Sequence, residues 1–413
     1  MTRFALVCPP FWSHVRAFEA LGEALVARGH EAVLVLNHGG AALSRSARVP
    51  AIEIAGEAGE ARRHALAGRQ GVFATVQEAA RRTDALCRHA PGLLGDLGVE
   101  AILADQTEPA GALLARHRAL PYLSVASALP TDPDPAIPPP YLGWPFDPSP
   151  RGLKRNRGGA RVADLVLGPQ RRVVRRWSET FALPGAPPER GLSPHGTLSQ
   201  TVDSFDFPRT GNRIFAVGPF RGAEPEWIAP LRRTEERPLV FASFGTLQGH
   251  RLGLFRRIAE ACRRLGLRLA IAHCGLLTAA EAATIDAELV ADFLPQRAML
   301  READVCVTHA GLNTVMDALE MGVPCLAIPF AFDQPGVAAR LSYRGAGLAL
   351  APRRLTTWRV ETALARLLAD PAFALAARRI GADIRSGGGS RRAAAIAEQL
   401  VGTPARRLEE LRA

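Results

Sequence analysis

The sequence predicts an α/β protein made of two Rossmann-like domains that face each other across a cleft. The chain has 413 residues, which is enough for two domains of ordinary size. Short apolar, β-branched runs bounded by Gly and Pro alternate with segments of helical periodicity, which is typical of parallel sheets. Both halves show this pattern, although no repeat is visible at the residue level.

The first half opens with a predicted strand at 4–8, followed by an apolar helical period that stops at Gly29. This strand–helix unit lacks a G-x-G-x-x-G, so the dinucleotide-binding fingerprint is absent. We expect an Ala/Arg-rich helical region over 51–95 and a strand that ends at Asp105. Further strands are predicted at 32–36, 121–125 and 213–218.

The second half opens with a predicted strand at 239–243 and the turn Phe244-Gly245-Thr246. The predicted elements that follow are strands at 268–273, 289–292, 305–308 and 325–328, a helix at 313–320 and an Ala-rich helix at 375–400. These elements divide the chain into an N-terminal domain at 1–220, a linker at 221–237, a C-terminal domain at 238–390 and a helical tail at 391–413.

Composition favours a cytoplasmic globular protein. Hydrophobic content is 47%, and no apolar run reaches the roughly 18 residues of a membrane-spanning helix. The N-terminus lacks the apolar core and cleavage site of a signal peptide. Six cysteines are scattered without C-x-x-C pairing, which fits a reducing compartment and argues against a zinc site. They are Cys8, Cys87, Cys262, Cys274, Cys306 and Cys325.

Positive charge is concentrated in one segment. The net charge is +11, and residues 151–176 hold nine Lys/Arg and one Asp. A solvated basic face is the simplest interpretation. An anionic membrane surface is the leading functional alternative, because polybasic clusters are attracted to anionic lipid. We expect no nucleic-acid partner, since aromatic residues are sparse there and no nucleic-acid motif accompanies the charge.

The turn at 309–311 predicts a phosphate site. It joins a strand to a helix, and the helix N-terminus offers unpaired N–H groups and a positive dipole end. Ligands of such sheets bind beyond the carboxyl ends of the strands. Gly311 lets the backbone approach a ligand, His309 adds an imidazole, and Asn313 and Thr314 add side-chain donors.

The spacing around this turn resembles the donor-binding signature of UDP-sugar-dependent glycosyltransferases of the GT-B fold. The matching residues are Pro295-Gln296, Thr308-His309-x-Gly311-x-Asn313-Thr314, Asp317, Gly322-Val323-Pro324, Pro329 and Asp333-Gln334. The resemblance implies that His309, Asn313 and Thr314 bind the diphosphate and that Asp317 binds the ribose. Asp333 and Gln334 would bind the sugar hydroxyls. The Gly245-Thr246 turn resembles the turn that touches the diphosphate.

Three positions differ from the plant form of this signature. Phe293 stands where a Trp stacks on uracil, Leu312 replaces a Trp, and Asp317 replaces a Glu. Phe still stacks on a base, and Asp still accepts a ribose hydrogen bond with a shorter reach. A preference for uridine over thymidine nucleotides is therefore left open. Together with these positions, the donor site would comprise Gly245, Thr246, Phe293, Gln296, His309, Gly311, Asn313, Thr314, Asp317, Asp333 and Gln334.

The same resemblance implies a catalytic pair in the first domain. The family places its catalytic base where His14 stands, and Asp105 is the partner by family position. A base is needed because an alcohol is a poor nucleophile at neutral pH, and imidazole has a suitable pKa. A carboxylate on the other ring nitrogen fixes its tautomer. Taken alone, His14 could also be a capping or core histidine, and Asp105 a capping carboxylate.

Looser strings resemble the bacterial zeaxanthin glucosyltransferases. They are PPFWSHVRAFEALGEALVARGH near the N-terminus, Ala-Leu-Pro followed by Ile-Pro-Pro-Pro, and Phe205-Asp206-Phe207-Pro208-Arg209. The resemblance implies an inverting transfer of glucose from UDP-glucose to a hydroxyl of an apolar acceptor, zeaxanthin first. It implies no metal and no cofactor, since UDP-glucose is a substrate. The enzyme would then act in the cytoplasm, peripheral to the inner membrane face.

Aromatic residues are the candidates for acceptor binding: Phe11, Trp12, Tyr141, Trp144 and Phe146. For the last three, in the Pro-rich stretch 131–150, ordinary loop packing is the alternative. This stretch also holds Asp132-x-Asp134, a spacing that elsewhere binds a metal, but its prolines favour an exposed loop.

Three other functions stay open. The acceptor could be a macrolide or flavonoid-like molecule. The protein could be a non-catalytic, nucleotide-sugar-binding accessory protein, which the presence of both His14 and the donor signature disfavours. An epimerase of similar fold would need a catalytic set acting on the bound sugar and no acceptor pocket.

Overall fold

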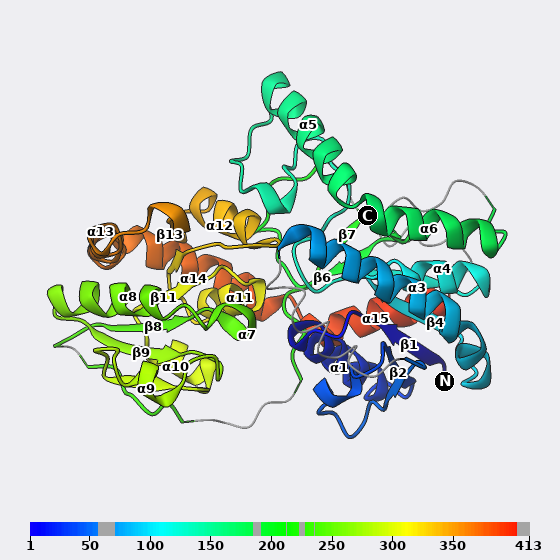
Figure 1. Ribbon diagram of the computed structural model, residues 1–413, viewed down its shortest axis with the longest axis horizontal. Helices are drawn as coiled ribbons and strands as arrows, with labels where there is room; N and C mark the ends of the chain where they lie inside the picture. Colours follow the sequence, from blue (N-terminus) through cyan, green and yellow to red (C-terminus); the bar gives the residue numbers. More distant parts are fainter. Residues whose placement is uncertain (57–70, 185–190, 212, 223–227, 235, 403–413) are drawn as a thin grey trace.

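The chain forms two lobes, each built around a parallel sheet (Figure 1). This computed structural model describes residues 1–56, 71–184, 191–211, 213–222, 228–234 and 236–402. Parts of the predicted linker (223–227 and 235), of the predicted helical region (57–70) and of the predicted tail (403–413) lie outside the described residues.

In the first lobe, the described strands follow the spatial order β3-β2-β1-β4-β5-β6-β7, and every neighbouring pair is parallel. The strands are β1 (Arg3–Val7), β2 (Glu31–Leu36), β3 (Ala51–Glu53), β4 (Ala101–Asp105), β5 (Tyr122–Ala126), β6 (Thr197–Ser199) and β7 (Ile214–Ala216). The helices are α1 (Trp12–Val26), η1 (Ala41–Leu43), α3 (Val72–Asp96), α4 (Ala110–His117), η2 (Pro140–Leu142), α5 (Pro150–Val166) and α6 (Gly168–Thr180).

In the second lobe, the described strands follow the order β10-β9-β8-β11-β12-β13, again all parallel. The strands are β8 (Leu239–Ser243), β9 (Arg268–Ala272), β10 (Leu289–Ala291), β11 (Val305–Thr308), β12 (Cys325–Ala327) and β13 (Gly347–Ala349). The helices are α7 (Gly245–Gln248), α8 (Leu252–Arg264), α9 (Ala279–Ala282), α10 (Gln296–Glu302), α11 (Leu312–Glu320), α12 (Gln334–Tyr343), η3 (Pro352–Arg354), α13 (Thr357–Ala369), α14 (Pro371–Ser386) and α15 (Gly389–Gly402).

Helices cover both faces of each sheet, so the central strands are buried and read as continuous apolar runs. Residues 4–7 of β1 and 239–242 of β8 are almost fully buried. In each sheet the strand order reverses beside the first strand, between β1 and β4 and between β8 and β11. Ligands of doubly wound sheets bind at this switch point, beyond the carboxyl ends of the strands. The predicted two-domain α/β architecture is confirmed.

The C-terminal helix returns to the first lobe. α15 packs against α1, and Ala393, Ala397 and Leu400 join the apolar core of the first lobe. The prediction of one continuous helix over 375–400 was wrong. The helix breaks between α14 and α15 at a Gly-rich turn, where Gly388 and Gly389 have φ of +84° and +50°. Such backbone suits glycine, and it redirects the chain from one lobe to the other (Figure 1).

Two other predictions in the first lobe need correction. Residues 51–53 form the edge strand β3 rather than helix, because Ile52 pairs with Val35 of β2. The short strand β6 was missed, since its sequence Thr-Leu-Ser carries no apolar alternation. Its Thr197 and Ser199 are nevertheless fully buried and hydrogen-bonded to nearby side chains.

The two lobes are joined by a buried ion pair. Arg340 of α12 donates from Nε to Asp206 Oδ1 at 2.6 Å, and both side chains are almost fully buried. Arg209 donates to the other oxygen of Asp206 at 2.7 Å. Phe207 packs nearby against Tyr343 in an edge-to-face contact, with ring centroids 5.2 Å apart. The string at 205–209 that resembles the zeaxanthin enzymes therefore lies at the contact between the lobes.

Candidate active site

His14 and Asp105 meet at the switch point of the first sheet. β1 and β4 are neighbours with Val7 opposite Ala104, so the loop after β1 and the end of β4 adjoin. His14 lies in the first turn of α1, and Asp105 is the last residue of β4. The His14 Nδ1 atom is 2.8 Å from Asp105 Oδ2. The structure thus brings together two residues that are 91 positions apart.

Three further hydrogen bonds fix the carboxylate of Asp105. Its Oδ1 accepts from the N–H and hydroxyl of Thr107 at 2.8 and 2.6 Å, and its Oδ2 accepts from the hydroxyl of Ser127 at 2.7 Å. Burial raises the pKa of Asp105, but the charge of His14 and these donors more than offset it, so the pKa is lowered. An ionised Asp105 requires His14 to carry its proton on Nδ1, which leaves the Nε2 lone pair available as a base.

Of the aromatic acceptor candidates, Phe11 lies beside this pair, while Trp12 has Arg16 and Arg45 over its ring. The Phe11 ring is 5.8 Å from the His14 ring between centroids, and Trp12 is 41% exposed. Tyr141 is exposed on η2. The other two pack elsewhere: Trp144 lies against Arg155 of α5, and Phe146 stacks on Phe207. Trp144 and Phe146 thus each have a packing partner, and their role in acceptor binding stays a prediction.

The predicted phosphate turn lies at the switch point of the second sheet. β8 and β11 are neighbours with Ser243 opposite Thr308, so the turns that follow them adjoin. A Cβ atom on Gly245 would lie 2.9 Å from His309 Cε1, and one on Gly311 would lie 2.5 Å from His309 Nε2. Glycine at both positions therefore lets the imidazole sit between the two turns. Thr246 is exposed, and Asn313 is half-buried in the first turn of α11.

His309 is a neutral imidazole near pH 7. Burial lowers its pKa to about 4, although the backbone of Ser243 opposes this. It can therefore donate a hydrogen bond to a phosphate without carrying a charge. The next residue, Ala310, has φ of +64°, which is unusual for a residue with a side chain. Such strain is often found at ligand-binding turns.

The predicted ribose residue Asp317 belongs to a polar network. Gln296 Nε2 donates to Asp317 Oδ2 at 2.6 Å, and the Thr314 hydroxyl donates to Gln296 Oε1 at 3.2 Å. Arg221 donates to Asp317 Oδ1, and so does Arg297 at 3.3 Å. Sequence reasoning missed both arginines. Arg221 is far from the donor signature in the sequence, and Arg297 follows Gln296 but is not one of the signature residues.

The end of the predicted donor site reaches the first lobe. Asp333 Oδ2 accepts from the backbone N–H of Leu129 at 2.9 Å. Burial raises the pKa of Asp333, and the backbone bond from Leu129 and the charges of His14 and Arg340 oppose this. Gln334 Oε1 accepts from the backbone of its own loop, at Phe330 and Ala331. Asp333 therefore contacts the first lobe two residues beyond Ser127, whose hydroxyl donates to Asp105.

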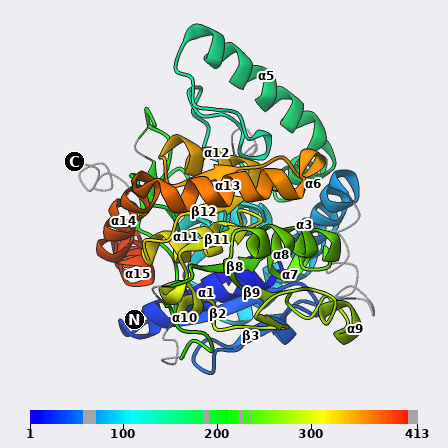
Figure 2. The ribbon, with the colours of Figure 1, turned by 90° about the vertical axis from the view of Figure 1, so that its left-hand side faces the viewer.

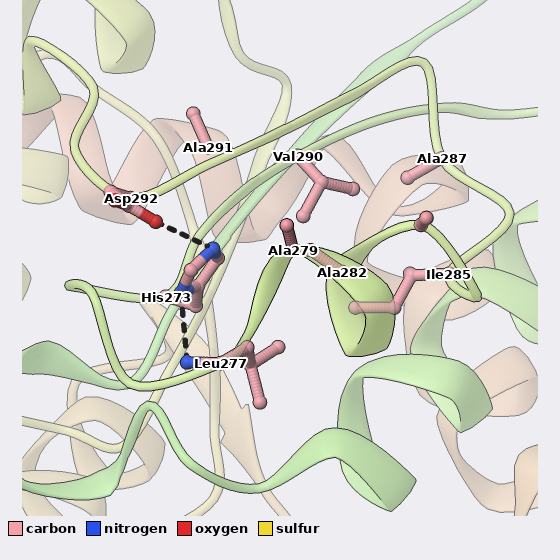
Figure 3. A pocket seen from close by; sticks show the side chains of 10 residues that line it. His273, Leu277, Ala279, Ala282, Ile285, Ala287, Val290, Ala291 and Asp292 are labelled. Carbon is pink, nitrogen blue, oxygen red and sulfur yellow. Dashed lines mark hydrogen bonds and ion pairs between the residues drawn. The ribbon is translucent and has the colours of Figure 1, made fainter.

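A cavity of about 600 Å³ is lined by residues between His273 and Asp292, and sequence reasoning missed it. Figure 3 shows its mainly small, apolar lining from α9 and β10. At one end His273 Nε2 contacts Asp292 Oδ1 at 3.1 Å, while its Nδ1 accepts from the N–H of Leu277 at 3.2 Å. Phe293 itself is 70% exposed, so its ring is available to a ligand.

The basic segment 151–176 divides into two environments. In α6, Arg171 pairs with Asp164 at 2.6 Å and Arg176 pairs with Asp84. α5 instead projects away from the body of the protein in both ribbon views (Figures 1 and 2). Within the described residues, none of the helices is both long and apolar enough to cross a bilayer.

The carboxylates of Asp132 and Asp134 accept structural hydrogen bonds, both from their own loop and from segments packed against it. Asp132 accepts from the Thr197 hydroxyl at 3.0 Å, and Asp134 accepts from the backbone of Ala136 and Thr210 at 2.9 and 2.8 Å. Across the described part of the chain, no three His, Cys, Asp or Glu side chains are grouped as a metal site would require.

Known proteins share both the sequence and this architecture. The chain is 37% identical to the zeaxanthin glucosyltransferase of Pantoea ananas, over 98% of this chain and 97% of that protein. It is 35% identical to that of Pseudescherichia vulneris, over 97% and 98%. The chain belongs to the GT-B glycosyltransferases. Residues 278–400 of this glycosyltransferase match the family described as "Erythromycin biosynthesis protein CIII-like, C-terminal domain".

Solved structures agree on the fold of the glycosyltransferase. The crystal structure of the glycosyltransferase of kitacinnamycin superposes with a TM-score of 0.79 at 20% identity, covering 97% of this chain and 99% of that one. The predicted membership in this family, and the prediction of a transferase enzyme, are confirmed.

Proposed function

We propose that this glycosyltransferase moves glucose from UDP-glucose to a hydroxyl of an apolar acceptor, with zeaxanthin as the first candidate. Full-length similarity to two zeaxanthin glucosyltransferases supports the sugar and the acceptor. The donor signature, from Gln296 to Gln334, supports a nucleoside diphosphate sugar as the donor.

In the proposed mechanism, His14 is the general base. Its Nε2 takes the proton of the acceptor hydroxyl while the oxygen forms a bond to the anomeric carbon. The bond from that carbon to the UDP oxygen breaks, and UDP leaves with the electron pair. Asp105 is a positioning residue that holds the Nδ1–H tautomer and stabilises the imidazolium. A single displacement inverts the α-linked donor to a β-linked product.

The leaving diphosphate would be stabilised by groups of the second lobe. The N-terminus of α11, the Gly245-Thr246 turn and the neutral His309 all supply hydrogen-bond donors at one point of the sheet. In this proposal, UDP release relies on these donors and needs no metal ion or other cofactor.

The contact of Asp333 with the first lobe is the main structural support for this mechanism. Asp333 Oδ2 accepts from the N–H of Leu129 at 2.9 Å, and two residues earlier the Ser127 hydroxyl donates to Asp105 at 2.7 Å, beside His14. Asp333 is where the resemblance puts the sugar hydroxyls, and His14 is where it puts the base. A sugar held by Asp333 would therefore present its anomeric carbon to an acceptor activated by His14.

The test is incubation of the purified protein with UDP-glucose and a panel of acceptors: zeaxanthin, a macrolide and a flavonoid. We expect a β-glucoside of zeaxanthin, identified by mass and by the coupling constant of the anomeric proton. Transfer only to the macrolide or flavonoid would correct the acceptor. An α-linkage would exclude single displacement, and binding without transfer to any acceptor would favour the accessory-protein alternative.

We also propose that the enzyme works at an anionic membrane surface, at the cytoplasmic face, because a carotenoid acceptor dissolves in lipid. α5 supports this. Its exposed Arg151, Lys154, Arg157 and Arg161 share one side with Val162 and Leu165, within an arc of about 140° at 3.6 residues per turn. Val162 and Leu165 are 57% and 79% exposed. A basic helix with exposed apolar residues suits the headgroup region of such a membrane.

A further inference from the structure

Arg221 connects the segment after β7 with α15 and with α11. It follows β7, where the chain leaves the first lobe, and its backbone N–H and C=O both bond the hydroxyl of Ser390 at 3.0 and 2.9 Å. Ser390 lies in the first turn of α15. The guanidinium of Arg221 reaches into the second lobe, where it donates to Asp317 and Glu320 of α11. Arg221 thus stands at the hinge between the lobes and contacts the helix that begins at the phosphate turn.

The carboxylate of Asp317 has one hydrogen-bonding position left. An ionised carboxylate offers about four acceptor positions, two on each oxygen. Oδ1 accepts from Arg221 and from Arg297, and Oδ2 accepts from Gln296. One position on Oδ2 therefore remains for a ligand. The side chain of Asp317 is 11% exposed, so the two guanidinium groups and the amide largely determine where that position points.

The charges of this cluster are balanced. Asp317 and Glu320 carry two negative charges, and Arg221 and Arg297 carry two positive ones, with Arg297 Nη1 2.7 Å from Glu320 Oε2. Burial raises the pKa of Glu320, but the two arginines offset this and lower it, so Glu320 is ionised. Asp317 lies about 8 Å along α11 from Leu312, at 1.5 Å per residue. Without Arg221, a net negative charge would remain near the proposed diphosphate site.

We propose that Arg221 is a positioning residue for nucleotide recognition: it fixes Asp317 so that Oδ2 accepts a hydrogen bond from the 2′-hydroxyl of the donor's ribose. This inference rests on the proposed function, in which the donor is a uridine nucleotide. Recognition of the ribose then depends on a residue outside the donor-binding lobe. Planar, bidentate arginine is suited to this role, because its two nitrogens can hold two carboxylates in a fixed relation.

The inference is tested by calorimetric binding of UDP and of 2′-deoxy-UDP, both without a divalent cation. For the wild-type protein, we expect UDP to bind about tenfold more tightly than 2′-deoxy-UDP, because a hydrogen bond to a charged group is lost. In Arg221→Met, UDP affinity should fall about tenfold, and the ratio between the two nucleotides should approach one. An unchanged ratio in a folded Arg221→Met variant would overturn the inference.

Two further variants separate orientation from charge. Arg221→Met combined with Glu320→Gln restores the charge balance without restoring the bond to Asp317. We expect it to recover part of the UDP affinity but not the preference for UDP over 2′-deoxy-UDP. Full recovery of that preference would mean that Arg221 acts through charge alone, which contradicts the positioning role. Arg221→Lys keeps the charge, and we expect it too to lose most of the preference. Its result decides the matter if Arg221→Met does not fold.

The matched control is Arg233→Met, which removes an exposed arginine that pairs with Asp304 in the second lobe. It should leave both affinities unchanged, and an equal loss in this control would contradict a specific role for Arg221. A wild-type protein that transfers glucose yet binds both nucleotides equally would also overturn the inference. The proposed function would survive that result, since the transfer assay tests it separately.

Discussion

The protonation of His309 depends on its surroundings. It lies between the Gly245 and Gly311 turns, where burial lowers its pKa to about 4 from the usual 6.5. At a pH between these two pKa values, His309 is protonated in the unfolded chain and neutral in the native protein. Linkage then requires that the free energy of unfolding falls as the pH drops from about 6.5 to about 4.

We predict that His309→Gln reduces this acid sensitivity. Glutamine cannot be protonated in this range, so the variant should lose less stability than the wild type between pH 7 and pH 4.5. Urea unfolding at pH 7 and at pH 4.5 gives the change in free energy of unfolding for each protein. Subtracting the change in the variant from that in the wild type cancels the contribution of the other titrating groups. His38→Gln, at a half-exposed histidine beside Glu53, is the control. Equal acid sensitivity in wild type and His309→Gln would contradict the prediction.

At the scale of single residues, the sequence could predict the positions of candidate site residues that lie at a strand end or in a turn after a strand. His14, Asp105 and His309 are of this kind, since a parallel sheet brings the ends of its strands to one edge. Arg221 could not be found in this way. It is 96 positions from Asp317, and only the path of the hinge brings the two together. The surroundings of Trp144 and Phe146 could not be predicted either, because an aromatic side chain in a loop packs wherever the fold offers apolar surface.

The element that would meet a membrane is α5. Reversing the charge of Arg151, Lys154, Arg157 and Arg161 to glutamate should reduce binding to anionic vesicles by at least tenfold, since each basic residue contributes about 1 kcal/mol near such a surface. UDP affinity should stay unchanged, because α5 lies outside the donor lobe (Figure 1). Sedimentation with vesicles of phosphatidylserine and phosphatidylcholine measures the binding, which should also weaken as salt rises.

The matched control reverses four exposed arginines of the second lobe: Arg353, Arg354, Arg359 and Arg379. It changes the net charge equally, so vesicle binding that depends on α5 should survive in it. Equal losses of vesicle binding in the two variants would show that only net charge matters. Undiminished vesicle binding by the α5 variant would mean that α5 is not the element that binds the membrane.

At the scale of elements, long periodic segments were easier to predict than short ones. Strands such as β1, β4 and β8 were predicted within one or two residues, because buried parallel strands are apolar throughout. β6 and β13 were missed, although β10 and β12 are equally short and were predicted. β10 has two adjacent branched apolar residues and β12 lies between Pro324 and Pro329, whereas β6 (Thr-Leu-Ser) and β13 (Gly-Leu-Ala) carry neither signal. The break between α14 and α15 depends on glycines in a left-handed conformation, and glycine alone does not show that a helix ends there.

At the scale of the whole molecule, the buried pair of Arg340 and Asp206 sets how the lobes meet. Asp206→Asn should destabilise the protein by about 3–5 kcal/mol, because it leaves a buried guanidinium without its charge partner. Urea unfolding measures this loss. The control is Glu31→Gln, which breaks the half-exposed pair with Arg3 and should cost less than about 1 kcal/mol. Similar small losses in both variants would mean that the lobes are held mainly by other contacts.

In the proposed mechanism, the base on one lobe activates an acceptor toward a sugar held by the other lobe. The most direct measurement is glucosyl transfer by His14→Ala, together with its affinity for UDP. Turnover should fall by roughly 10²- to 10⁴-fold, the usual contribution of general-base catalysis, while UDP affinity stays nearly unchanged because the proposed donor site lies on the other lobe. A well-folded His14→Ala variant with near wild-type transfer would contradict the account.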